Sequence, residues 1–284
     1  MTWREVFREL GVGVASRSQL VASGATGRML TAAVRAGHLL RLRRDRYALP
    51  DLPRPIAEAV RVGGILACTS ALRHHGVFGA DPFTHVHLPG NAGRLRSPRS
   101  RAVRFAEQRD GIELHWRPLL APAAADDCAV GVVDALAQAL RCQPPVLAVA
   151  SIDNALFLRK VTVGEVRRML ATMPRSVRRL GRWIDARSEA GQETVLRRLV
   201  HEAGLPYEVQ VTIPGVGRVD LLVAGCLILE ADSRLAHAGW EAAARDRRRD
   251  LVAASLGFRT LRPTYEHTML EPELVLAAIL RALR

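Results

Sequence analysis

The chain is predicted to be a multidomain α/β (α+β) protein, and three features of its sequence predict this. Residues 193–203 carry apolar side chains at the spacing of one helical face, and residues 207–231 contain three strand-like segments. Residues 1–50 read as short helices followed by two short strands. A chain of 284 residues with 49% hydrophobic and 24% charged residues is long enough for two or three domains with proper cores.

The C-terminal region is expected to have the element order helix, three-strand meander, helix, strand. Its first helix, 193–203, ends where Gly204 and Pro206 break the pattern. Alternating apolar residues and the turns at 214–217 and 224–225 then define the meander. The expected strands, second helix and last strand are, in order, 207–213, 218–223, 226–231, 240–255 and 258–262.

Polar side chains recur ten residues apart in these strands. If both turns are tight, Gln210 faces Asp220, Asp220 faces Glu230, and Asp232 lies on the same sheet face as Glu230. A lone acid in a strand is more often an edge or solvent-facing residue, but two carboxylates about 5 Å apart repel unless a cation lies between them. The row therefore predicts a site for a hard divalent ion such as Mg²⁺ or Mn²⁺.

The motif and its elements resemble a known nuclease core. Asp220, nine intervening residues and then Glu230-Ala231-Asp232, in this order of helices and strands, look like the PD-(D/E)XK core. With the arginine-rich run 246–250, residues 190–284 are more closely similar to the actinobacterial Vsr-like group, relatives of the very-short-patch-repair endonuclease. The resemblance implies a Mg²⁺- or Mn²⁺-dependent endodeoxyribonuclease in which Asp220 and Glu230 bind the metal and Glu193 assists.

The third motif position departs from the pattern of that superfamily. It is usually Lys, but here it is Asp232, and the only lysine in the chain is Lys160. His237 is the general base expected by residue type, because an imidazole accepts a proton near neutral pH, and Asp232 is the alternative. Gln210 is expected to position water or phosphate. The arginines expected to hold backbone phosphates in this region are Arg247 and Arg249.

Basic charge is concentrated near the N-terminus, where residues 1–50 hold nine arginines and three acids. Ser16 and Gln19 match a capping box, and Thr26 can cap a second helix. Residues 38–50 read as two short strands around a basic turn. Together with a helix over 3–10, these elements predict a winged helix-turn-helix.

This N-terminal pattern resembles the first domain of AbiEi-type antitoxins, in which a Gly-x-x-x-Arg stretch leads to a Tyr-Ala-Leu strand, here Gly37 to Arg41 and Tyr47 to Leu49. The expected DNA contacts are Arg28 and Arg35 in the major groove and, on phosphates, Arg41, Arg43, Arg44 and Arg46. A winged helix can instead dock proteins, so a protein-binding role stays open.

The middle of the chain carries weaker signals. Residues 51–174 resemble the AbiEi middle region, a mixed α/β connector expected to serve as scaffold and partner-binding surface, and 175–189 is expected to be a basic linker. The histidine pairs at 74–75 and 85–87 lack a carboxylate or cysteine at recognisable spacing. The four cysteines, also without zinc-binding spacing, are expected to be reduced thiols of a cytoplasmic protein without a structural zinc site. They are Cys68, Cys128, Cys142 and Cys226.

The net charge of +13 favours a polyanionic partner, and DNA is the first candidate. No signal peptide or membrane span is expected from the sequence. The leading hypothesis is a DNA-binding endonuclease that acts in DNA repair or in defence. A toxin or a repair factor is a candidate further partner, and a homodimer is a candidate assembly. The alternative is an AbiEi-type regulator whose nuclease-like domain is inactive and serves binding or dimerisation. An RNA-directed nuclease is a third hypothesis, although 5% aromatic residues offer no evident stacking platform.

Overall fold

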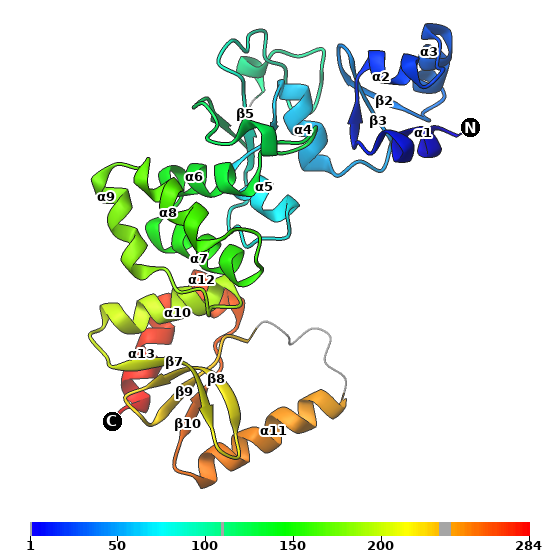
Figure 1. The fold of residues 1–284 in the computed structure, drawn as a ribbon. Helices are drawn as coiled ribbons and strands as arrows, with labels where there is room; N and C mark the ends of the chain where they lie inside the picture. Colours follow the sequence, from blue (N-terminus) through cyan, green and yellow to red (C-terminus); the bar gives the residue numbers. More distant parts are fainter. Residues whose placement is uncertain (1, 109–110, 233–239) are drawn as a thin grey trace. The chain divides into compact units, whose positions relative to one another are not determined.

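A computed structural model of the protein describes residues 2–108, 111–232 and 240–284. The fold is mixed α/β, as expected. The chain divides into two compact units, Met1–Cys142 and Gln143–Arg284, so the division lies within the segment predicted to be the middle domain (Figure 1). In the described part of the chain, no helix combines the length and the apolar character needed to cross a membrane.

Residues 2–50 contain the three predicted helices and the two predicted strands, together with a short strand over Val14–Ala15 that was not predicted. Their helices and strands are α1 (Trp3–Leu10), β1 (Val14–Ala15), α2 (Arg17–Ala22), α3 (Gly27–Arg35), β2 (Leu40–Arg43) and β3 (Arg46–Ala48). The capping box is confirmed, because the Ser16 hydroxyl accepts a hydrogen bond from Gln19 N at 3.1 Å, and Thr26 caps α3 in the same way. The strands lie in the order β1-β3-β2, and buried Leu20, Leu30 and Leu39 fill the core between them and the helices.

The rest of the first unit is a second small sheet with helices. Its elements are α4 (Arg54–Val62), β4 (Ile65–Leu66), α5 (Cys68–His74), β5 (Thr84–His87), η1 (Phe105–Glu107), β6 (Ile112–His115), η2 (Pro122–Ala124) and α6 (Val132–Cys142). The central strand β5 pairs antiparallel with β4 and parallel with β6. His87 is paired with His115, and His85 is two residues away along the same strand face.

The second unit begins with helices. They are α7 (Pro145–Phe157), α8 (Val163–Ala171), α9 (Arg175–Arg178) and the 3₁₀ turn η3 (Arg179–Trp183). The last two occupy much of the segment predicted to be a linker. Trp183 packs there, with the Arg198 guanidinium 3.6 Å from its ring centroid and the His201 ring 4.4 Å away. The aromatic ring thus fixes this segment to the helix that follows it.

The predicted order helix, meander, helix, strand is confirmed. Its elements, followed by two helices that the sequence analysis did not assign, are α10 (Gly191–Glu202), β7 (Tyr207–Ile213), β8 (Gly217–Val223), β9 (Leu227–Leu229), α11 (Trp240–Ser255), β10 (Arg259–Leu261), α12 (Tyr265–Leu270) and α13 (Pro272–Ala282). The sheet order is β10-β9-β8-β7, with β10 parallel to β9. The tight-turn register is also confirmed, since Leu221 pairs with Val209 on one side and with Leu229 on the other.

Helices cover both faces of this sheet (Figure 1). On one face, buried Leu196 of α10 and Ile279 of α13 pack against Leu221 and Leu229. On the other face, Ala253 of α11 packs with a second set of apolar side chains from the strands. Each such leucine or isoleucine stabilises the fold by about 1.5–3 kcal/mol through burial. The polar row of the meander lies near the N-terminal turn of α10, because Gln210 contacts Glu193 there.

Candidate active site

Four acids predicted from the sequence line one cavity of about 440 Å³. Glu193 comes from the first turn of α10, Asp220 from the middle of β8, and Glu230 and Asp232 from the chain just after β9. The meander register brings Asp220 beside the end of β9, and α10 packs its N-terminal turn over the same place. Asp220, Glu230 and Asp232 therefore meet at one site, as the spacing predicted, and Glu193 joins them, as the resemblance implied.

Gln210 links two of these acids. Its Nε2 donates hydrogen bonds to Glu193 Oε2 at 3.1 Å and to Asp220 Oδ1 at 3.4 Å. Its backbone has φ of 55°, which is rare for a residue other than glycine and costs about 1–3 kcal/mol. The amide oxygen, Gln210 Oε1, is buried without a hydrogen-bond partner. This strained residue thus holds two carboxylates together and leaves one oxygen acceptor unsatisfied.

Glu193 caps the N-terminus of α10, and its surroundings raise its pKa. Its Oε1 accepts a hydrogen bond from Ala190 N at 2.9 Å and its Oε2 accepts one from Glu189 N at 3.0 Å. Burial, and then the negative charge of Asp220, raise the pKa of Glu193 to about 8, although the hydrogen bonds from Ala190 N and Gln210 oppose this rise. The buried Glu193 carboxyl beside the half-buried Asp220 carboxylate accounts for this shift.

Asp220 and Glu230 have different surroundings. Asp220 Oδ2 accepts a hydrogen bond from Ala231 N at 2.9 Å. Glu230, whose side chain is 15% exposed, forms ion pairs with Arg249 Nη2 and Arg262 Nε, each at 2.8 Å. Among the described residues, the acids of this cavity do not bring three carboxylate oxygens within 4.8 Å of one another. The structure thus directs Glu230 toward two guanidinium groups, whereas Asp220 is joined to Glu193.

The residues that could hold a cation follow from these contacts. Glu193 and Asp220 offer carboxylate oxygens, and Gln210 offers a buried amide oxygen that lacks a donor. Hard divalent ions such as Mg²⁺ and Mn²⁺ bind oxygen ligands of this kind. The two carboxylates fit Mg²⁺ by ligand type, whereas Gln210 Oε1 would join them only if the amide turned, because Nε2 now faces both acids. The metal role predicted for Glu230 requires it to leave an arginine.

Arginines line the other side of the cavity. Arg218 forms an ion pair with Glu189, and Arg249 donates hydrogen bonds to the carbonyl oxygens of Val216 at 3.0 Å and Arg218 at 2.9 Å. The expected phosphate contact Arg249 is therefore tied to the sheet, whereas Arg247 is exposed. His237, the general base expected by type, lies outside the described residues.

Arg262 was not predicted to belong to the site, although the pairing of β10 with β9 places it there. Arg262 directly follows β10, and Glu230 directly follows β9. Because β10 runs parallel to β9 with Leu261 opposite Leu229, the next residues of both strands must be neighbours. Recognition of the parallel pairing would have placed Arg262 against Glu230 before the structure was known.

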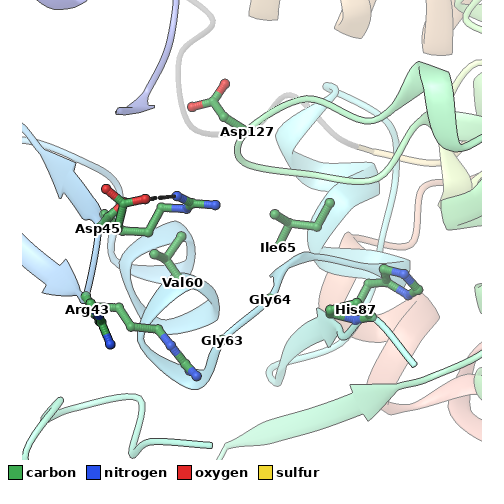
Figure 2. A pocket seen from close by; sticks show the side chains of 11 residues that line it. Arg43, Asp45, Val60, Gly63, Gly64, Ile65, His87 and Asp127 are labelled. Carbon is green, nitrogen blue, oxygen red and sulfur yellow. Dashed lines mark hydrogen bonds and ion pairs between the residues drawn. The ribbon is translucent and has the colours of Figure 1, made fainter. Parts of the chain in front are cut away.

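The basic N-terminal segment presents most of its predicted DNA contacts to solvent. Those with exposed side chains are Arg28, Arg35, Arg41, Arg44 and Arg46. Arg43 differs, because its Nη1 donates to Val62 O at 2.8 Å and its pKa is lowered, mainly by burial. It lines a cavity of about 490 Å³ together with Asp45 and Arg46 (Figure 2). In the structure, Arg43 binds backbone carbonyls, which leaves the exposed arginines as the candidates for phosphates.

Comparison with known proteins does not assign the chain to a group. No family model matches it, and no curated protein matches it.

Proposed function

We propose that the protein is a DNA-binding, Mg²⁺-dependent endonuclease of the PD-(D/E)XK type. The observation that carries this proposal is the joining of Glu193 and Asp220 by Gln210 in a cavity lined on its other side by Arg218, Arg249 and Arg262. Paired carboxylates beside guanidinium groups suited to phosphate are the parts that metal-assisted hydrolysis of a phosphodiester uses. The resemblance of residues 190–284 to the Vsr-like group supports the same chemistry.

In this proposal each group of the cavity has a defined role. Asp220 and Glu193 would hold the ion through their carboxylate oxygens, and the ion would withdraw charge from a phosphate oxygen and lower the pKa of a water. Arg262 and Arg249 bind the phosphate and release Glu230 to the ion. Because a bound ion would keep Glu193 ionised, the proton would pass instead to Asp232, which lines the same cavity at the position of the motif lysine.

The test is cleavage of supercoiled plasmid DNA by the full chain. We expect nicking with Mg²⁺ or Mn²⁺, none with EDTA, and a loss of at least about 100-fold in rate for Asp220→Asn, because the ion loses a charged ligand. Glu208→Gln, which changes an exposed acid on β7, is the matched control and should retain full activity. Intact plasmid with every divalent ion, together with absence of ion binding by calorimetry, would reject the catalytic proposal.

A second function is favoured by one specific observation, the pairing of Glu230 with both Arg249 and Arg262. Such neutralisation, with Asp232 at the usual lysine position, suits a regulator of the AbiEi type whose C-terminal domain binds or dimerises without cleaving. Sequence-specific binding to its own upstream DNA without cleavage would support this function. An operator with two half-sites would also imply a homodimer.

A further inference from the structure

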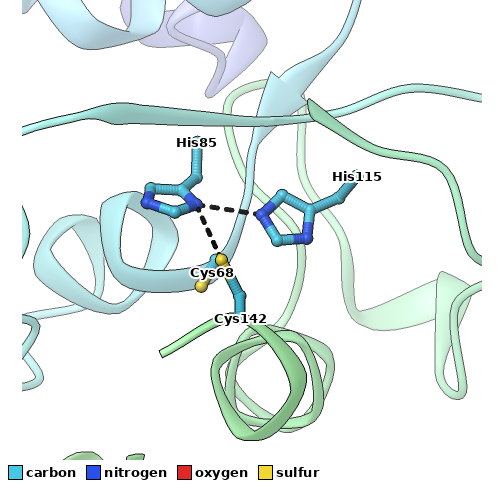
Figure 3. A group of neighbouring side chains, drawn as sticks. All are labelled: Cys68, His85, His115 and Cys142. Atoms are coloured by element: carbon cyan, nitrogen blue, oxygen red, sulfur yellow. Dashed lines mark hydrogen bonds between the residues drawn. The ribbon is translucent and has the colours of Figure 1, made fainter. Parts of the chain in front are cut away.

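Four side chains far apart in the sequence meet inside the first unit (Figure 3). One ligand-type atom from each lies within 4.8 Å of the corresponding atom of every other. His85 Nδ1 is 2.9 Å from His115 Nε2 and 3.8 Å from Cys142 Sγ. The four are Cys68, which begins α5, His85 on β5, His115 at the end of β6 and Cys142 at the end of α6.

These distances suit a tetrahedral metal ion. Zinc bonds of about 2.0–2.1 Å to nitrogen and 2.3 Å to sulfur place neighbouring ligand atoms about 3.3–3.8 Å apart. The 3.8 Å separation of His85 Nδ1 from Cys142 Sγ is close to the value of about 3.5 Å for a nitrogen–sulfur pair. The 2.9 Å contact between the imidazoles is a hydrogen bond in which the two nitrogens share one proton. A bound metal ion would take the place of that proton. Two cysteine sulfurs and two imidazoles favour zinc over Mg²⁺, which prefers oxygen.

The surrounding residues fully bury two of these four side chains and hold them in position. Cys68 and His85 are fully buried, His115 is half-buried, and Cys142 is exposed. The other nitrogen of His85, Nε2, lies 3.3 Å from Asp81 Oδ2, although the pair misses the angle of a good hydrogen bond. A carboxylate behind a ligating histidine fixes the ring and raises its basicity. Cys68 also has a left-handed φ of 47° and donates its backbone N–H to Gln138 Oε1 at 2.8 Å, which holds it in place.

We propose that Cys68, His85, His115 and Cys142 bind one Zn²⁺ ion as a closed structural site that stabilises the first unit. The sequence analysis expected no structural zinc site, because these residues lack the close pairs of a zinc finger. The fold supplies the proximity instead. The parallel pairing of β5 with β6 brings the histidines together, and the ends of α5 and α6 supply the cysteines. All four protein ligands are present, so no position remains open for a substrate.

The first experiment measures metal in the full-length protein purified without chelator. Elemental analysis should find about one zinc per chain, as expected for a four-ligand site. After removal of zinc, added Co²⁺ should give the absorption bands of a tetrahedral site with thiolate ligands, and the thermal unfolding temperature should fall without metal and recover with zinc.

Cys142→Ser tests the ligands, because Cys142 is the most exposed of the four and its replacement perturbs the core least. The variant should lose stoichiometric zinc, while the control Cys226→Ser, at another exposed cysteine, keeps it. Zinc content equal in both variants would overturn the proposal. So would a wild-type chain that gives no tetrahedral cobalt spectrum, stoichiometric iron in place of zinc, or a Cys68–Cys142 disulfide in freshly purified protein.

Discussion

Glu193 occupies a position where one side chain serves two purposes. It closes the first turn of α10 by accepting hydrogen bonds from Ala190 N and Glu189 N, and it shares the Gln210 amide with Asp220. Burial and the neighbouring carboxylate favour its protonated form. A cation that binds both carboxylates would reverse this preference, so the proton and the metal compete for the same atoms.

The raised pKa of Glu193 predicts how stability depends on pH in metal-free buffer. The folded chain retains a proton up to a pH of about 8, whereas the ordinary value is 4.5. This contribution is fully present below pH 4.5 and is lost as the pH rises through about 8, at no more than about 1.4 kcal/mol per pH unit. Glu193→Gln should therefore flatten the decline in unfolding free energy over this window, as measured by urea denaturation.

Glu208→Gln serves as the control for that experiment, because its exposed side chain on β7 lies outside the cavity. It should unfold with the pH dependence of the wild type. An identical slope for Glu193→Gln and the wild type would show that Glu193 is ionised in the folded protein, contrary to the raised pKa.

For these acids, the sequence predicted which residues are neighbours but not the direction in which each side chain points. The ten-residue spacing and tight turns fixed which residues of the meander are neighbours, and the observed register agrees. The orientation of Glu230 depends on Arg249 and Arg262, which come from later elements. A spacing rule within one meander contains no information about such partners.

Between elements, α7 and α10 are joined by a buried charge pair. Arg197 Nη2 lies 2.6 Å from Asp153 Oδ2, which also accepts a hydrogen bond from Thr194 at 2.8 Å. Asp153 is fully buried and Arg197 is 6% exposed. Burial raises the pKa of Asp153, and the charge of Arg197 opposes that rise. The pair therefore depends on both partners being present.

Removal of one partner should be costly. Asp153→Leu leaves the Arg197 guanidinium buried without its carboxylate, so the free energy of unfolding should fall by about 3–5 kcal/mol. The double variant Asp153→Leu with Arg197→Leu removes both charges and should be more stable than the single variant. Guanidinium denaturation of the four proteins in this cycle gives the coupling. Additive losses would show that the two charges do not depend on each other.

Prediction succeeded for elements with strong local signals. The capping box of α2 and the alternation of β7 gave helices and strands where they occur. Helix α4 was missed, as was α13, although α13 contributes Val275 and Ile279 to the core. The zinc-ligand set was missed for a different reason, since its four residues become neighbours only through contacts between distant elements.

For the whole molecule, the net charge of +13 bears on partner binding more than on folding. The exposed arginines of α3, Arg28 and Arg35, belong to the segment predicted to contact DNA. If they contact phosphates or bases, binding should weaken steeply as salt increases, because each neutralised phosphate releases counterions.

Double substitution Arg28→Ala with Arg35→Ala tests this expectation. DNA affinity should fall, and if both residues contact phosphates the slope of log affinity against log salt should become shallower by about 2, near 0.9 for each lost phosphate contact. Fluorescence anisotropy across a salt series measures the slope. The control, Arg167→Ala with Arg168→Ala, removes the same charge from exposed positions on α8 and should retain the wild-type slope. Equal losses in both variants would mean that charge alone governs binding.

The boundary between the two units, after Cys142, leaves each candidate site whole. The last zinc ligand is the final residue of the first unit, and every acid and arginine of the carboxylate cavity follows it in the sequence. A single crossover in the gene at this boundary would therefore pass either site intact to a new protein. Exchange of halves with another gene could redirect the proposed nuclease to a different target without rebuilding its chemistry.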